Sequence, residues 1–194
     1  MNELSALIDL LSMLLLDVRT GTLIALLLVA AVIDWRTLRI PNWLTVGGMV
    51  LGLAISTVHG ATLAKGLGQA AGGLGVGLLV FLPLYMLRVL GAGDVKLMAM
   101  VGAFLGPSST ISALIYVVVT GGIAAILVAT ARGAVGRLAL NVYFIVNVAR
   151  VPTADPAWSG HASGTGQSVG KLPYGISICI GTLAYLVTRQ LGIA

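Results

Sequence analysis

Two aspartates border apolar stretches of the chain, and together they could carry out acid–base chemistry. Asp34 ends the run AAVID, and Asp94 precedes the run VKLMAMVGAFLG. A carboxylate next to hydrocarbon costs free energy unless it is paired, hydrated or functional. Two carboxylates that share a site hold one proton between them, because both cannot ionise easily. The ionised carboxylate could then activate a water molecule, while the protonated one polarises a carbonyl and protonates a leaving amine.

Simpler interpretations of the two aspartates stay open on the residues alone. Either one could be an interfacial charge at a helix end, and Asp94 could cap the helix that follows it. Arg36 or Arg39 could neutralise Asp34 as a structural ion pair. The sequence does not assign the roles of base and acid to the two aspartates, because a dyad titrates as a unit.

The residues beside the aspartates suit a site that accepts an extended peptide. Gly91 and Gly93 lie just before Asp94 in the sequence GAGD. Because they have no Cβ atoms, they allow positive φ angles and close approach of a substrate. Pro41 cannot continue a helix, and Asn42 is predicted to be the N-cap of a helix that starts at Trp43.

The elements that must position these residues are membrane helices. The chain has 194 residues, of which 58% are hydrophobic and 9% charged, with a mean hydropathy of +1.06, whereas soluble domains carry about 25% charged residues. We expect an all-α membrane protein, a polytopic bundle of about six transmembrane helices in the lipid bilayer. The predicted spans are residues 20–34, 43–59, 67–88, 95–106, 110–131 and 174–191. The fourth is short, so it is either tilted or begins inside the protein.

The distribution of basic residues predicts the orientation of the bundle. With the loop 35–42 in the cytoplasm, the cytoplasmic segments hold Arg36, Arg39, Arg88, Lys96, Arg132, Arg137, Arg150 and Lys171. The outer segments hold only Arg19, Lys65 and Arg189. Cytoplasmic loops carry the excess of basic residues in membrane proteins, so Asp34 and Asp94 are predicted to lie at the cytoplasmic face.

The remaining segments define the expected domain organisation. Residues 1–19 form an N-terminal extension, whose part 3–17 fits either an interfacial helix or an extension of the first span. It lacks the basic n-region of a signal peptide. Residues 20–194 form the membrane domain, in which 132–172 are expected to be a cytoplasmic amphipathic helix, at 138–150, followed by a flexible loop. Whether 138–150 crosses the membrane stays open.

Several other functions are not favoured by the sequence. The basic residues are scattered singly, which argues against nucleic-acid binding. No CxxC pair is available for zinc, and Cys179 reads as a small packing residue. His59 and His161 are not placed near the aspartates. We therefore expect no metal and no cofactor. Pairs of glycines four residues apart indicate close helix packing, and self-association into a homo-oligomer stays possible.

Three motifs together resemble a known family. The pattern D-x-x-x-x-x-I-P-N runs from Asp34 to Asn42, and G-x-G-D-x-K runs from Gly91 to Lys96. KLPYGISICIG, with Pro173, Tyr174 and Gly175, follows later in the chain. In order and spacing they resemble the type IV prepilin peptidases, which are membrane aspartic peptidases of the GxGD type.

The resemblance implies a function and a site. It implies that Asp34 and Asp94 are catalytic. Lys96 matches the lysine of the motif and could help to ionise Asp94 or meet an acidic substrate residue, but a role as an interfacial anchor explains it equally well. The implied substrates are type IV prepilins or pseudopilins, cut between a short basic leader and a hydrophobic helix at the inner membrane. The larger members of the family carry paired CxxC motifs that this chain lacks. It therefore looks like the compact branch of Flp-type (tight-adherence) pilus systems, without N-methyltransferase activity.

Other classes of function remain as alternatives. A GxGD intramembrane protease that cuts other signal-like helices would use the same aspartates. A small proton or cation transporter would need ionisable groups at mid-membrane depth and a polar path to the outer side. A non-catalytic assembly scaffold would not need both aspartates or the flexible GAGD turn.

Overall fold

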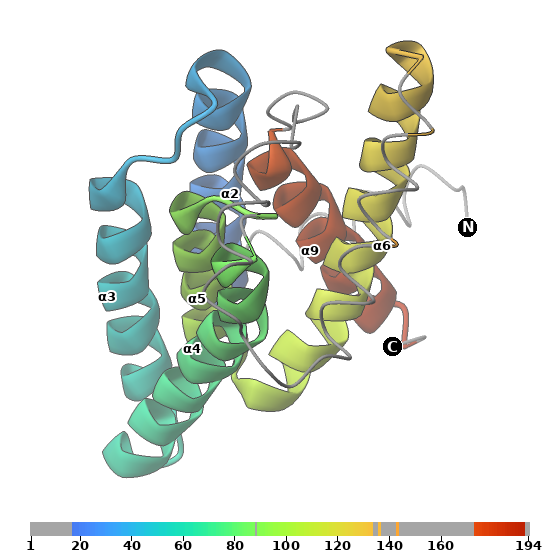
Figure 1. Ribbon diagram of the computed structural model, residues 1–194. Helices are drawn as coiled ribbons and strands as arrows, with labels where there is room; N and C mark the ends of the chain where they lie inside the picture. Colours follow the sequence, from blue (N-terminus) through green and yellow to red (C-terminus); the bar gives the residue numbers. More distant parts are fainter. Residues whose placement is uncertain (1–16, 88, 134–135, 137–142, 144–172, 193–194) are drawn as a thin grey trace, which may run out of the picture. The chain divides into compact units, whose positions relative to one another are not determined.

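The described part of the chain is a set of α-helices. The computed structural model describes residues 17–87, 89–133, 136, 143 and 173–192, and within these ranges it contains no strand. The helices are α2 (Val18–Thr37), α3 (Asn42–Val58), α4 (Leu63–Met86), α5 (Ala92–Leu105), α6 (Pro107–Ala131) and α9 (Tyr174–Gln190) (Figure 1). The predicted all-α class is confirmed.

The chain divides into two compact units. The first comprises Met1–Gly121 and Pro173–Ala194, and the second comprises Gly122–Leu172. The first unit holds α2 to α5, α9 and the beginning of α6, and it contains both aspartates. Of the second unit the structure describes mainly the end of α6. The expected segments 3–17, 138–150 and 151–170 lie almost entirely outside the described residues.

Helix α5 is enclosed by its neighbours because glycines let the backbones approach closely. The helix pairs α4–α5, α3–α5 and α3–α4 are in contact. A Cβ on Gly73 of α4 or on Gly102 of α5 would collide with backbone atoms of the opposite helix. In α3, a Cβ on Gly52 would lie 2.9 Å from the Phe104 ring. The Ser56 hydroxyl also donates to the Ala103 carbonyl at 3.0 Å.

Helix α9 completes the first unit by packing against α2, α5 and α6. Contacts join α2 to α9 and α5 to α9. A Cβ on Gly181 would lie 2.6 Å from the Val117 Cα atom. The Thr120 hydroxyl contacts the Ser177 carbonyl at 3.0 Å. Residues from opposite ends of the sequence therefore lie side by side.

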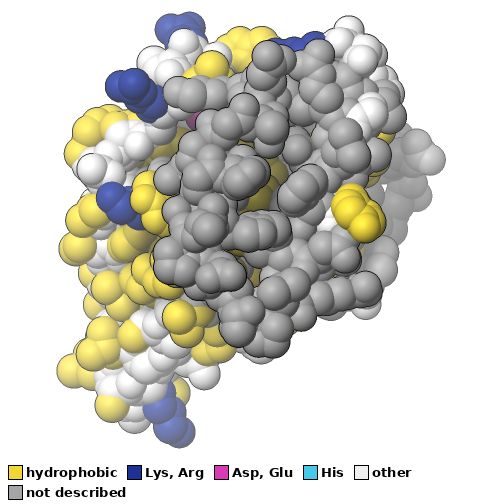
Figure 2. All heavy atoms as spheres, in the orientation of Figure 1, with side chains coloured by type: hydrophobic (Ala, Val, Ile, Leu, Met, Phe, Trp, Pro, Cys, Tyr) yellow, Lys and Arg dark blue, Asp and Glu magenta, His cyan; other side chains and the backbone are white. Residues whose placement is uncertain are grey.

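Three of the described helices have the length and composition of membrane spans. α2, α4 and α6 are long and apolar enough to cross a bilayer, and α3 is a shorter apolar helix. Large apolar side chains point outward, among them Val32, Leu79 and Ile115, each more than half exposed. Figure 2 shows many hydrophobic side chains on the visible described surface, with Lys and Arg in its upper half and at its lower end. This is the surface expected of a protein that faces lipid.

The predicted segments match the helices, with differences at their ends. α4 begins four residues before the predicted 67, because the Thr62 hydroxyl caps it by accepting from the Lys65 amide at 3.2 Å. α2 continues three residues past 34 to Thr37, and its C-cap Leu38 has a left-handed φ of 52°. α5 has 14 residues, about 21 Å of helix. It is shorter than the hydrocarbon core and enclosed by protein, which supports the interpretation that it begins inside the bundle.

Candidate active site

Asp34 is held in the last turns of α2 by a backbone amide from α9. Its side chain is only 4% exposed. The Gly175 N–H donates to Asp34 Oδ2 at 2.8 Å, and this amide is free to do so because it lies in the first turn of α9. In the described part of the chain Asp34 forms no ion pair with Arg36 or Arg39, so the structural ion pair is not formed.

Asp94 lies in the first turn of α5 and is partly buried. The Gly91 N–H donates to Asp94 Oδ2 at 3.0 Å, which satisfies an amide just before the helix. The interpretation of Asp94 as a capping residue of α5 is therefore confirmed. A capping contact occupies one carboxylate oxygen and does not exclude acid–base chemistry at the other.

Ile40 brings the three motifs together at one end of the bundle. A Cβ on Gly93 would lie 3.1 Å from Ile40 Cβ, and a Cβ on Gly175 would lie 3.1 Å from Ile40 Cδ1. Asp34 is close enough to Asp94 for the two carboxylates to interact electrostatically, and Asp94 interacts in the same way with the Tyr174 hydroxyl. The aspartates, 60 positions apart in the sequence, are thus neighbours in the fold.

Lys96 and Asn42 join the first motif to the second. Lys96 Nζ donates to Asn42 Oδ1 at 2.8 Å. Asn42 is the first residue of α3 and Pro41 is its N-cap, without a side-chain cap hydrogen bond. The expectation that Asn42 caps a helix from Trp43 is therefore wrong, because its side chain bonds to Lys96 instead.

Tyr174 fixes the beginning of α9. Its ring packs edge-on against the buried Phe81, with the centroids 6.2 Å apart and an interplanar angle of 65°. A Cβ on Gly121 would lie 2.5 Å from the Tyr174 hydroxyl, so α6 leaves room for this ring only because position 121 is glycine. Pro173 is the N-cap of α9. The third motif therefore places the Gly175 amide opposite Asp34.

The glycines before Asp94 serve close approach and not unusual backbone angles. Gly91 has a φ of −79°, and among the described glycines only Gly106, Gly133 and Gly192 have positive φ. The expectation of positive φ at Gly91 and Gly93 is wrong. A Cβ on Gly93 would be tightly packed against Ile40, which would have to shift slightly to make room for it.

Sequence reasoning missed two elements of this site. It did not identify Ile40 as the contact between the motifs, although the residue is part of the quoted pattern. It also did not assign the Gly175 amide to Asp34. The described residues contain no group of three His, Cys, Asp or Glu side chains that could hold a metal ion. The Nδ1 atom of His59 contacts the Ile55 carbonyl in its own helix at 2.9 Å.

The arrangement suits activation of a water molecule by a carboxylate pair. One buried carboxylate accepts a backbone amide, and a second lies close enough to interact with it electrostatically. Such a pair favours sharing of one proton. The Lys96–Asn42 hydrogen bond joins α5, which carries Asp94, to the start of α3, and the Gly175–Asp34 hydrogen bond joins α9 to α2, which carries Asp34.

The comparisons with known proteins agree with these motifs. Residues 21–126, more than half of the chain, match the model of the type IV leader peptidase family. The searches of curated proteins and of solved structures found no significant match. The matched range contains both aspartates and the Lys96–Asn42 contact. With several helices able to cross a membrane, the chain is a multi-pass membrane protein that belongs to the type IV leader peptidase family.

Proposed function

We propose that this protein is an aspartic prepilin peptidase in which Asp34 and Asp94 are the catalytic pair. The observation that carries the proposal is the convergence of the two carboxylates at one end of the bundle, with Asp34 held by the Gly175 amide. Family membership supplies the peptidase activity. The carboxylate pair supplies a mechanism that needs no metal.

In the proposed reaction the ionised aspartate takes a proton from water, which attacks the scissile carbonyl. The protonated aspartate donates a hydrogen bond to the carbonyl oxygen and then a proton to the leaving amine. The products are the basic leader and a pilin with a new N-terminus. Pilin-type substrates fit because their hydrophobic helix can lie beside the bundle while the leader stays at the interface. Flp-type prepilins are the proposed substrates.

The charge distribution supports a cytoplasmic location for the site, in the inner membrane of a bacterium. Arg36, Arg39 and Lys96 lie at or near the ends of the helices that carry the aspartates. Arg19, Lys65 and Arg189 lie at the opposite helix ends. An excess of basic residues marks the cytoplasmic side.

The proposed function is tested by incubating the purified full-length chain with an Flp-type prepilin in lipid nanodiscs. We expect cleavage between the leader and the hydrophobic helix, identified from the mass of both products. A chelator is expected to leave the rate unchanged, because the carboxylates act without metal. A membrane protein with a signal-like helix but no prepilin leader serves as the comparison substrate. Equal cleavage of both substrates would contradict prepilin specificity, and no cleavage of either would contradict the peptidase.

Substitution Gly175→Ala tests the amide that holds Asp34. The new Cβ would lie 2.8 Å from Asp34 Oδ2, closer than such atoms pack, so the carboxylate must move. We expect kcat to fall by about tenfold to a hundredfold, because displacements near 1 Å have effects of this size. The rate is measured by mass spectrometry under single-turnover conditions. Gly47→Ala is the control, since a Cβ there meets nothing within 4 Å. An unchanged rate in Gly175→Ala would refute the role of this contact.

A further inference from the structure

A cavity lies at the end of the first unit that is remote from the aspartates. It has a volume of about 350 Å³ and is lined by the start of α2 and the ends of α5 and α9. Arg19 and Asp34 are fifteen positions apart on α2, and Gly175 and Arg189 are fourteen positions apart on α9. At 1.5 Å per residue the cavity is about 20 Å from the proposed active site. It is therefore a separate site.

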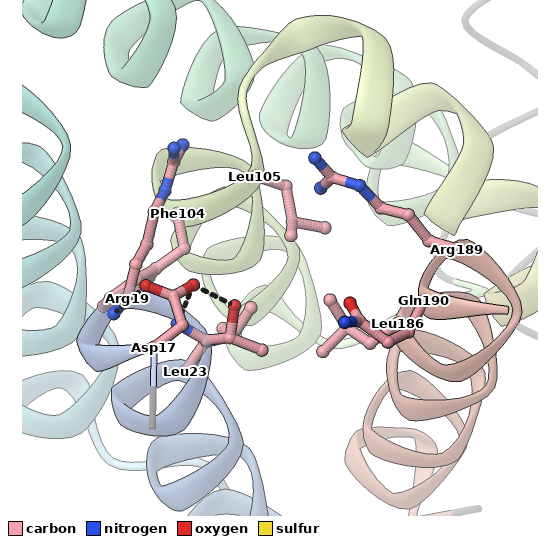
Figure 3. A pocket seen from close by; sticks show the side chains of 9 residues that line it. Asp17, Arg19, Leu23, Phe104, Leu105, Leu186, Arg189 and Gln190 are labelled. Carbon is pink, nitrogen blue, oxygen red and sulfur yellow. Dashed lines mark hydrogen bonds between the residues drawn. The ribbon is translucent and has the colours of Figure 1, made fainter. Parts of the chain in front are cut away.

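Two arginines face this cavity. Figure 3 shows Arg19 of α2 and Arg189 of α9 on either side of it, with Leu105 of α5 between them. The two positive charges are close enough to oppose each other. Arg19 Nε is buried and has no hydrogen-bond partner among the described residues. A buried donor without an acceptor is costly, so an anion that bonds to it would be stabilised.

Asp17 also lines the cavity, but it is engaged at the beginning of α2. Its carboxylate accepts from the Thr20 hydroxyl at 2.6 Å, and from the amides of Thr20 and Arg19 at 3.3 and 3.4 Å. The Thr20 hydroxyl holds the pKa of Asp17 below its usual value, against the smaller opposing effect of burial. Asp17 is therefore an ionised helix cap, and two arginines against one aspartate leave the cavity with a net positive charge.

The inner wall of the cavity is apolar. Leu23, Phe104 and Leu186 line it, and each is at most 5% exposed. A small inorganic anion would leave this wall without a partner, whereas an amphiphile would contact both the wall and the arginines. The amphiphilic anions that surround a membrane protein are anionic phospholipids. Its phosphate suits guanidinium groups, which can donate two parallel hydrogen bonds.

We propose that this cavity binds the phosphodiester headgroup of an anionic phospholipid, with Arg19 and Arg189 contacting the phosphate and the upper acyl chain against Leu23 and Leu186. The site lies at the ends of α2 and α9, where headgroups meet the bundle. It does not depend on the peptidase activity, because none of its residues belongs to the proposed active site.

The proposal is tested by native mass spectrometry of the full-length chain in detergent, titrated with phosphatidylglycerol. We expect one tightly bound lipid. Arg19→Gln and Arg189→Gln should each weaken its binding by about tenfold or more, since hydrogen bonds between charged groups have this effect. Lys65→Gln is the matched control, because it removes one positive charge near the same end of the bundle but outside the cavity. Lys65→Gln should bind as the wild type does.

Two further measurements identify the ligand and separate binding from folding. Phosphatidylcholine, whose phosphate is neutralised by choline, should bind more weakly, and inorganic phosphate should not displace the lipid. Displacement by inorganic phosphate would overturn the lipid assignment. Equal weakening by Lys65→Gln would mean that the effect is general electrostatics. Arg189 is exposed, so its variant should keep the wild-type thermal midpoint. Unchanged lipid binding in Arg189→Gln would refute the site even if Arg19→Gln failed to fold.

Discussion

Replacing Asp94 by asparagine is expected to lower the rate of leader cleavage by about 10³-fold or more, and Asp34→Asn is expected to do the same. Asparagine has nearly the shape of aspartate but can neither take nor give the proton. General acid–base groups contribute about 10²–10⁴-fold to catalysis. In the wild type the Gly175 N–H donates to Asp34 Oδ2 at 2.8 Å, and the side-chain oxygen of an asparagine at position 34 can still accept this hydrogen bond. The loss would therefore come from chemistry and not from displacement of α9.

The double variant distinguishes a dyad from two separate charges. If the aspartates share one proton, Asp34→Asn with Asp94→Asn should be about as inactive as either single variant, because residues that act as a unit are not additive. The rates are measured as kcat/KM on purified protein, and folding is checked from the thermal midpoint. Lys65→Gln is the control, since it removes a charge at the start of α4, at the opposite end of the bundle from the proposed site. Wild-type rates in either single variant would remove that aspartate from the mechanism.

Gly73→Ala is expected to destabilise the bundle by about 3 kcal/mol, the cost of strong overpacking. The new Cβ would lie 2.7 Å from the Gly106 Cα atom and would also collide with the Gly102 carbonyl. Both obstacles are backbone, so α4 and α5 would have to separate, and α5 carries Asp94. The effect is measured as the midpoint of thermal unfolding in detergent, with cleavage activity as a second readout.

Gly75→Ala is the matched control in the same helix. A Cβ at position 75 meets nothing within 4 Å, so this variant should keep its stability or gain up to about 1 kcal/mol from the better helix propensity of alanine. Opposite effects of the two substitutions would support the close contact of α4 and α5. Equal destabilisation by both would contradict it.

The sequence was sufficient to predict the helices and the meeting of the two aspartates. Long apolar stretches with few charges leave few alternatives to membrane helices, and the alternation of these helices already placed Asp34 and Asp94 at the same end. The short α5 was expected as an exception, and the structure explains it by enclosure within the bundle. These features are set by local composition and by the order of the helices.

The details of the site depended on contacts that the sequence does not reveal. Asn42 has the usual chemistry of an N-cap, but Lys96, 54 positions away, takes its side chain instead. The partner of Asp34 is a backbone amide, which has no signature in residue type. Arg19 and Arg189 are 170 positions apart and reach one cavity only because α2 packs against α9. In each case the contact is set by the tertiary arrangement and not by the local sequence.

The antiparallel packing of α4 on α5 sets the depth at which the proposed reaction would take place. Gly77 lies against Met98, so the first turn of α5 is level with Phe81, five residues before α4 ends at Met86. Asp94 is therefore about 8 Å below the tip of α4. To reach Asp94, the scissile peptide bond would have to pass the end of α4 in an extended conformation. In a helix its carbonyl would be engaged in an intrahelical hydrogen bond. Local unwinding of the pilin helix would then precede hydrolysis. The depth of the two aspartates would favour substrates whose helix unwinds easily next to the cleavage site.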